Sequence, residues 1–246
     1  MGFFGAFIAV ALAGAPPARA IQEWGDQIPN LNAAGGCDGL CHSSGGLMSP
    51  LYLELEAAGF KWKAAVANAD ADGDGFSNGW ELQNPSGTWV SGTANPGSAL
   101  LVSNPTLPGD LPPLPVAVAP TPIVHAEAAG QNGSQPFAVK NVGAVPFDYS
   151  ITPSDAWMVP FSAGLGLPGG EQDDLLLMFA TNSLMAGPYP GDLIIAIPGI
   201  RADRIPMVPV ALTVPEPGAV VAEAGVLLSL GLLARRSAGR LRAART

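Results

Sequence analysis

The strongest chemical signal in the sequence is a run of twelve residues, Asp70 to Glu81, in which oxygen donors recur at regular positions. Positions 1, 3, 5, 7, 9 and 12 of a calcium loop are filled by Asp70, Asp72, Asp74, the Phe76 carbonyl, Asn78 and Glu81. Gly75 at position 6 permits the sharp turn. Four carboxylates packed this tightly repel one another unless a cation lies between them. The run therefore predicts a Ca²⁺ site.

Cys37, Cys41 and His42 form a second reactive group, and these two cysteines are the only ones in the chain. Outside the cytoplasm such close thiols are normally oxidised, which favours a Cys37–Cys41 disulfide. The alternative is haem c, because Cys-x-x-Cys-His motifs attach haem and use the histidine as an axial ligand. Here the spacer has three residues, and Met48 is a candidate second ligand. The sequence also allows two other states of this group, which are binding of another metal and a pair of reduced thiols.

Catalytic groups are harder to find. Serines are plentiful, but the chain has only two histidines, His42 and His125, and these lie in segments that we expect to be separate domains. A serine–histidine–acid arrangement therefore has no candidate, and calcium accounts for the acidic cluster. The sequence predicts a protein that is not an enzyme.

Short elements are expected around the acidic loop. Leu51 to Asn68 contains good helix formers but is interrupted by Gly59, and only one turn fits between Trp80 and Pro85. We therefore expect one short helix, the loop and a helical stub. A single loop of this kind favours a structural role over a sensor switch.

Composition places these elements in an exported, turn-rich protein. The 246 residues allow two small domains, and 31 Gly, 25 Pro and 13% charged residues favour loops and short strands. Between Ile21 and Pro217 there are five basic and nineteen acidic residues, a net charge near −14. This acidity argues against nucleic-acid or anionic-lipid partners and suits divalent cations.

Both ends of the chain carry targeting features. Residues 1–20 place an apolar run before Ala18-Arg19-Ala20, as in a cleavable signal peptide. Residues 215–246 contain Pro215-Glu216-Pro217, a hydrophobic helix over 218–234 and an arginine-rich end. The basic end should stay in the cytoplasm. We expect an exported protein that is transiently anchored in the inner membrane by this single C-terminal helix.

The body of the chain divides at a proline-rich stretch. Residues 109–123 predict an extended linker. Residues 124–214 alternate short β-prone runs with turn residues, which predicts an antiparallel sandwich of about seven strands. Trp157 is expected to anchor its core. The fold class expected for the whole is a small α+β calcium-loop domain followed by an all-β immunoglobulin-like sandwich.

Residues 21–108 resemble the temptin-type domain. The resemblance is carried by Ile28-Pro29-Asn30, the Cys37–Gly46 run, Ala57–Trp62, the EF-hand-like acidic loop, Trp89 and Ser103-Asn104-Pro105. It implies a small binding module, supported by a disulfide and calcium, without known catalysis. Temptin itself is a secreted, pheromone-associated protein.

One departure from the animal pattern is informative. Where that pattern has two further cysteines, this chain has Ala67 and Gly87. The family's long-range disulfide is therefore expected to be missing. Calcium and the aromatic side chains Trp62, Trp80 and Trp89 would then carry more of the stability.

Two further resemblances concern the rest of the chain. Asn141-Val142-Gly143, Asp148–Ile151, Ser154–Pro160 and Val208–Val214 are similar to BACON-type immunoglobulin-like domains of bacterial surface proteins. Val214 to Arg240 resembles the PEP-CTERM sorting tail, which implies cleavage by an exosortase near Pro217 and a mature protein on the cell surface or outside it.

Together these features predict a noncatalytic, calcium-stabilised surface or matrix protein. Exopolysaccharide or other surface proteins are the expected partners. The alternative is an exported monohaem electron-transfer protein that uses Cys37, Cys41 and His42.

Overall fold

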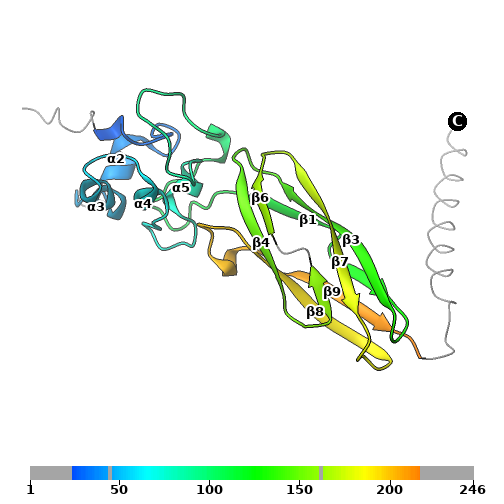
Figure 1. The fold of residues 1–246 in the computed structure, drawn as a ribbon. Helices are drawn as coiled ribbons and strands as arrows, with labels where there is room; N and C mark the ends of the chain where they lie inside the picture. Colours follow the sequence, from blue (N-terminus) through cyan, green and yellow to red (C-terminus); the bar gives the residue numbers. More distant parts are fainter. Residues whose placement is uncertain (1–23, 44–45, 161–162, 217–246) are drawn as a thin grey trace, which may run out of the picture. The chain divides into compact units, whose positions relative to one another are not determined.

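The computed structural model describes residues 24–43, 46–160 and 163–216. The chain divides into two compact units, Met1–Pro112 and Pro113–Thr246 (Figure 1). The predicted signal peptide at 1–20 and the predicted C-terminal helix at 218–234 both lie outside the described residues. Within the described ranges, no helix has the length and apolar character needed to cross a membrane.

The first unit consists of short helices joined by long loops. Its α-helices are α2 (Gly36–Cys41), α3 (Pro50–Ala57), α4 (Ala64–Ala67) and α5 (Asn78–Glu81), followed by the 3-10 helix η1 (Ala99–Leu101). Its described part contains an isolated bridge between His42 and Met48 but no strand. The strands expected of an α+β domain are thus replaced by loops, which side-chain hydrogen bonds hold in place.

The helical segment before the acidic loop is interrupted at Gly59, as the sequence predicts. Ser49 caps α3 by accepting a hydrogen bond from the Tyr52 N–H at 3.0 Å, and Pro50 occupies the first turn. Gly59 follows the end of α3 with φ of 73°. The chain then forms α4 as a separate single turn, so two short helices precede the loop instead of one. After the loop, α5 is the expected stub.

The core of the first unit packs around the leucines of α2 and α3. Leu40, Leu51 and Leu82 are fully buried beside Trp62. The predicted tryptophan cluster takes an unexpected form: Asn84 Oδ1 accepts from the Trp62 Nε1–H at 2.7 Å and from the Trp89 backbone N–H at 3.1 Å. A side-chain amide therefore ties these two segments together.

The second unit is a β-sandwich (Figure 1). One sheet has the strand order β1-β3-β7-β5 and the other β2-β9-β8-β4-β6. The strands are β1 (Val116–Ala119), β2 (Ile123–Ala126), β3 (Asn132–Asn141), β4 (Phe147–Pro153), β5 (Met158–Pro160), β6 (Ala163–Leu167), β7 (Gln172–Ala180), β8 (Gly187–Ala196) and β9 (Val208–Val214). All neighbours pair antiparallel except β2 and β9, which are parallel.

The described residues form nine strands against the predicted seven or so, and one of them, β1, falls in the range predicted to be a linker. Residues Val116 to Ala119 pair with Ala138 to Asn141 of β3, so much of the proline-rich stretch is part of the sandwich. Proline is tolerated beside edge strands, where no ladder partner needs its missing N–H. The predicted linker 109–123 is therefore too long.

Alternation along the strands builds the sandwich core. In β9, Val208, Val210, Leu212 and Val214 are buried and the residues between them are exposed. Trp157 is buried as expected, with its ring 6.1 Å from that of Phe179 and 6.3 Å from that of Tyr189. A side chain of this size anchors the space between the sheets.

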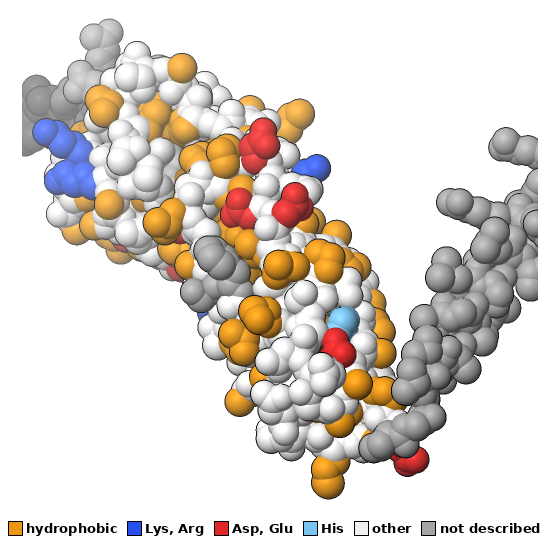
Figure 2. Space-filling model, turned by 45° about the vertical axis from the view of Figure 1, so that its right-hand side comes forward, with side chains coloured by type: hydrophobic (Ala, Val, Ile, Leu, Met, Phe, Trp, Pro, Cys, Tyr) orange, Lys and Arg blue, Asp and Glu red, His pale blue; other side chains and the backbone are white. Residues whose placement is uncertain are grey.

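Cationic side chains are sparse on the surface. On the face drawn in Figure 2, Lys and Arg form only small patches among apolar, uncharged and acidic groups. Five basic against nineteen acidic residues between positions 21 and 217 explain this pattern. The described residues on this face therefore form no extended basic patch that could bind a phosphate backbone.

Candidate metal centre

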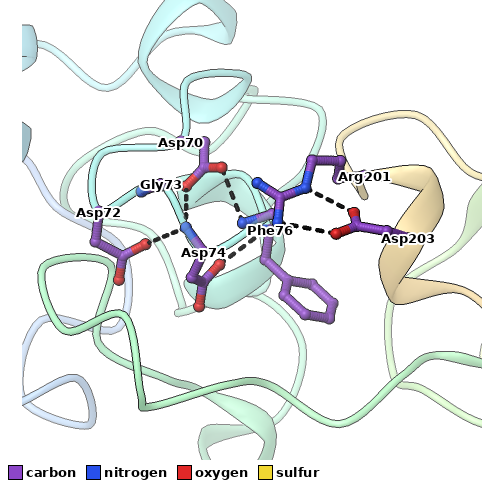
Figure 3. Close-up of polar contacts among 8 residues, drawn as sticks. Asp70, Asp72, Gly73, Asp74, Phe76, Arg201 and Asp203 are labelled. Atoms are coloured by element: carbon purple, nitrogen blue, oxygen red, sulfur yellow. Dashed lines mark hydrogen bonds and ion pairs between the residues drawn. The ribbon is translucent and has the colours of Figure 1, made fainter.

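Asp70 organises the acidic loop from its first position. Its Oδ1 accepts hydrogen bonds from the backbone N–H groups of Gly73 at 2.9 Å and Asp74 at 3.1 Å, and its Oδ2 accepts from Gly75 N–H at 2.9 Å (Figure 3). Gly73 and Gly75 adopt φ of 78° and 101°, which only glycine reaches without strain. One carboxylate and two glycines thus curl the chain into a tight turn.

The next two aspartates complete the turn. Asp72 Oδ1 accepts from the Asp74 N–H at 3.1 Å, and Asp74 Oδ1 accepts from the Phe76 N–H at 2.8 Å (Figure 3). Carboxylate oxygens of Asp70, Asp72 and Asp74 lie within 4.8 Å of one another. The structure therefore brings together the three aspartates that the sequence singles out.

Glu81 reaches the loop from α5 and is completely buried. Its Oε1 accepts from the Ser103 hydroxyl at 3.0 Å, and its backbone carbonyl accepts from the Ser103 N–H at 3.1 Å. Its other oxygen, Oε2, and Oδ2 of Asp72 are buried with no hydrogen-bond partner among the described residues. A buried carboxylate oxygen without a partner is energetically costly, and a cation would remove that cost.

Burial and mutual repulsion show in the pKa values. The pKa of Glu81 is raised to about 9, first by burial and then by the negative charge of Asp72. The pKa of Asp72 is raised to about 6, again first by burial. A Ca²⁺ ion would reverse both effects because it favours the ionised carboxylates. The donor set of hard oxygens suits Ca²⁺.

Asn78, the predicted ligand at position 9, also braces the loop. Its Oδ1 accepts from the Ala71 N–H at 3.1 Å, and its Nδ2 donates to Glu54 Oε2 at 2.6 Å and to the Val66 carbonyl at 2.8 Å. The fully buried amide is thereby engaged on both its oxygen and its nitrogen. Its role as a calcium ligand stays a prediction.

Two other residues that contact the site were not identified from the sequence. Glu54, on α3, holds Asn78 from 24 positions away, and Ser103 holds Glu81 from 22 positions away. Ser103 is among the residues that carry the family resemblance, but no local pattern marks either residue as a partner of the acidic loop, because that role depends on tertiary packing. The Phe76 carbonyl stays a predicted ligand. The Phe76 side chain is buried.

The cysteine group is also assembled. Cys37 and Cys41 lie one turn apart on α2 with their Sγ atoms 3.4 Å from each other, a hydrogen-bonding distance. A disulfide needs about 2.0 Å, so the predicted bond is not formed in this structure and stays a prediction. Burial raises the pKa of the Cys41 thiol to about 12. Nδ1 of His42 is buried without a hydrogen-bond partner among the described residues.

Comparison with known proteins finds relatives of the first unit. The family described as Temptin C-terminal matches residues 18–108. Temptin from Aplysia californica is 34% identical over 95 residues, which make up 37% of this chain and 76% of that protein. The residues matched by the family include the acidic loop, the cysteine group and Ser103.

Solved structures give only distant likenesses. The ASH/PapD-like domain of human CEP192 covers 44% of this chain and 94% of that chain at 11% identity, with a TM-score of 0.35. The chaperone YadV covers 47% and 59% at 11% identity, also with a TM-score of 0.35. These scores are too low to place any part of this chain in either family.

Proposed function

This chain belongs to the temptin family through residues 18–108, and on that premise we propose that it is a noncatalytic, exported protein whose first unit is a calcium-stabilised binding module. The second unit acts as a β-sandwich spacer. Calcium serves the fold of the first unit and does not switch it between two states.

One observation carries the calcium assignment. Three aspartates with oxygens within 4.8 Å of one another share a loop whose last residue, Glu81, is a fully buried carboxylate. Two oxygens of this group lack hydrogen-bond partners within the described residues. Natural proteins rarely leave such groups unsatisfied, and a divalent cation satisfies them together.

Calorimetric titration tests the assignment. Chelator-stripped protein, from Ile21 to Pro217, is titrated with CaCl₂ and, separately, with MgCl₂. We expect one Ca²⁺ per chain and weaker Mg²⁺ binding, because Mg²⁺ demands stricter geometry. The Asp72→Asn variant, which keeps the side-chain shape, should bind at least about tenfold more weakly. Absence of calcium binding by the wild-type chain would contradict the assignment.

Processing and location are also part of the proposal. The PEP-CTERM-like tail supports transient inner-membrane anchoring, cleavage by an exosortase near Pro217 and delivery to the surface or matrix, with exopolysaccharide or other surface proteins as partners. Fractionation of cells that express the full chain, with intact-mass measurement, tests this route. A mature mass that retains residues 218–246 would contradict cleavage.

The haem alternative concerns His42, whose Nδ1 is buried without a hydrogen-bond partner among the described residues. Against it, Cys41 is packed in the hydrophobic core with Leu40 and Leu51, and the two sulfurs are in contact. We propose that the pair forms a disulfide after export. A Soret band that survives denaturation would establish the haem reading instead.

A further inference from the structure

A cleft in the first unit lies between two loops that are far apart in the sequence, residues 25–32 and 89–95. Its volume is about 310 Å³, at the lower end of the roughly 300 to 1,000 Å³ typical of ligand sites. None of its lining residues belongs to the acidic loop or the cysteine group. It is thus a separate feature of the unit.

The walls of the cleft are fixed before any ligand arrives. Asn30 donates its N–H to Asn95 Oδ1 at 3.0 Å and its Nδ2–H to the Pro96 carbonyl at 3.0 Å, across 65 or more positions of sequence. The Ser91 hydroxyl donates to the Asp26 carbonyl at 2.5 Å. A preformed site loses little conformational entropy on binding.

Trp89 forms a rigid apolar wall. The indole is half-buried, its Nε1–H donates to the Ala94 carbonyl at 3.0 Å, and its backbone N–H donates to Asn84 Oδ1. On the same cleft, the exposed side chains of Asp26 and Asn32 make no hydrogen bond to the described part of the chain. Their oxygens and the Asn32 amide N–H are available to a ligand.

These groups define the chemistry of the ligand. The described residues that line the cleft include no Lys, Arg or His, so they offer no counter-charge to an anionic ligand. A single carboxylate is too few for Ca²⁺, which takes about six to eight oxygens. A sugar ring fits, because its C–H face can lie on an indole while its hydroxyls donate to a carboxylate and exchange hydrogen bonds with an amide.

We propose that the cleft binds a sugar ring of a neutral polysaccharide, with Trp89 as the apolar wall and Asp26 and Asn32 as hydrogen-bonding groups. This rests on the proposed noncatalytic binding role and names the partner class for it. The site shares no residue with the acidic loop, so the two assignments fail separately.

Affinity electrophoresis tests the proposal on the chain from Ile21 to Pro217 in calcium. The gels contain dextran, mannan or galactan as neutral probes, alginate as a polyanion, or polylysine as a polycation. We expect at least one neutral polysaccharide to retard the wild-type protein. Asn32→Ala removes an exposed amide, so the fold should persist and the dissociation constant should rise roughly threefold to tenfold. Asn68→Ala, at an exposed position outside the cleft, is the matched control and should change nothing.

Trp89→Ala should abolish retardation, with the melting temperature measured in parallel because this indole also contacts the core. If that variant fails to fold, polysaccharide binding by the Asn32→Ala and Asp26→Asn variants tests the proposal instead. Retardation by none of the neutral polysaccharides, or only by alginate or polylysine, overturns the proposal. The proposal is also overturned if the Asn32→Ala and Asp26→Asn variants bind the polysaccharide as tightly as the wild type. The calcium titration is unaffected by any of these outcomes.

Discussion

Glu81 places one carboxylate oxygen on the Ser103 hydroxyl and leaves the other buried without a hydrogen bond to the described residues. At the scale of single residues, this arrangement accounts for how the acidic loop would hold the proposed Ca²⁺ ion. Ser103 fixes the orientation of Glu81, and the three aspartates fix the turn. The second oxygen of Glu81 is thereby left for a cation.

Ser103→Ala tests this orienting role. Without the hydroxyl, Glu81 Oε1 loses its partner and the side chain is less well positioned, so calcium affinity should fall about tenfold, as for other residues that orient metal ligands. Calorimetric titration measures the change. Ser98→Ala is the control, because the Ser98 side chain makes no capping hydrogen bond. An unchanged affinity in Ser103→Ala would show that Glu81 needs no orientation.

The raised pKa of Glu81 predicts a pH dependence of the metal-free protein. The folded pKa is about 9, against 4.5 for the ordinary side chain. The unfolded chain therefore releases this proton more readily, and stability falls as pH rises from about 5 to 9. Melting temperatures in EGTA should decrease over that range, and calcium should remove the decrease.

Glu81→Gln is the matched variant for this measurement, because it cannot ionise. Its melting temperature in EGTA should vary less with pH than that of the wild type. Equal slopes for the two proteins would show that Glu81 is not the group responsible.

At the scale of elements, Asn78 ties the loop to α3 and α4 through Glu54 and the Val66 carbonyl. The helices are too short to be stable alone, so these contacts and the leucine core must hold them. The metal loop and the helices therefore support each other.

Asn78→Ala distinguishes this bracing role from a ligand role. The variant leaves buried partners unsatisfied, so the free energy of unfolding should fall by about 2 to 3 kcal/mol. A brace predicts this loss in EGTA as well as in calcium, as measured by urea denaturation. A loss seen only in calcium would support the predicted ligand role of Asn78 instead. Asn68→Ala, at an exposed position, provides the comparison.

The elements also show how far the sequence alone could lead. Strict spacing marked Asp70, Asp72, Asp74 and Glu81, because a metal loop is a local pattern. Alternating burial marked most strands of the sandwich. The partners Glu54 and Ser103 could not be found, since they join the loop only through tertiary packing, and β1 was hidden by the prolines around it.

At the scale of the whole molecule, the two units have separate cores and different means of support. The sandwich relies on alternating apolar strands and Trp157. The first unit has a small core and, at Gly87, no room for the missing cysteine: a Cβ there would lie 2.4 Å from Ala64 Cα. Because the long-range disulfide expected from the resemblance cannot form without a cysteine at position 87, we propose calcium as the main stabiliser of this unit.

Differential scanning calorimetry of the chain from Ile21 to Pro217, in calcium and in EGTA, tests this central claim most directly. At a calcium concentration of 100 times the dissociation constant, binding adds about 2.7 kcal/mol. For a domain of this size that corresponds to roughly 10 to 20 °C. EGTA should lower one transition by this amount and leave the transition of the sandwich in place, and Asp70→Ala should abolish the difference. Identical thermograms of the wild-type chain in calcium and EGTA would contradict a calcium-stabilised fold.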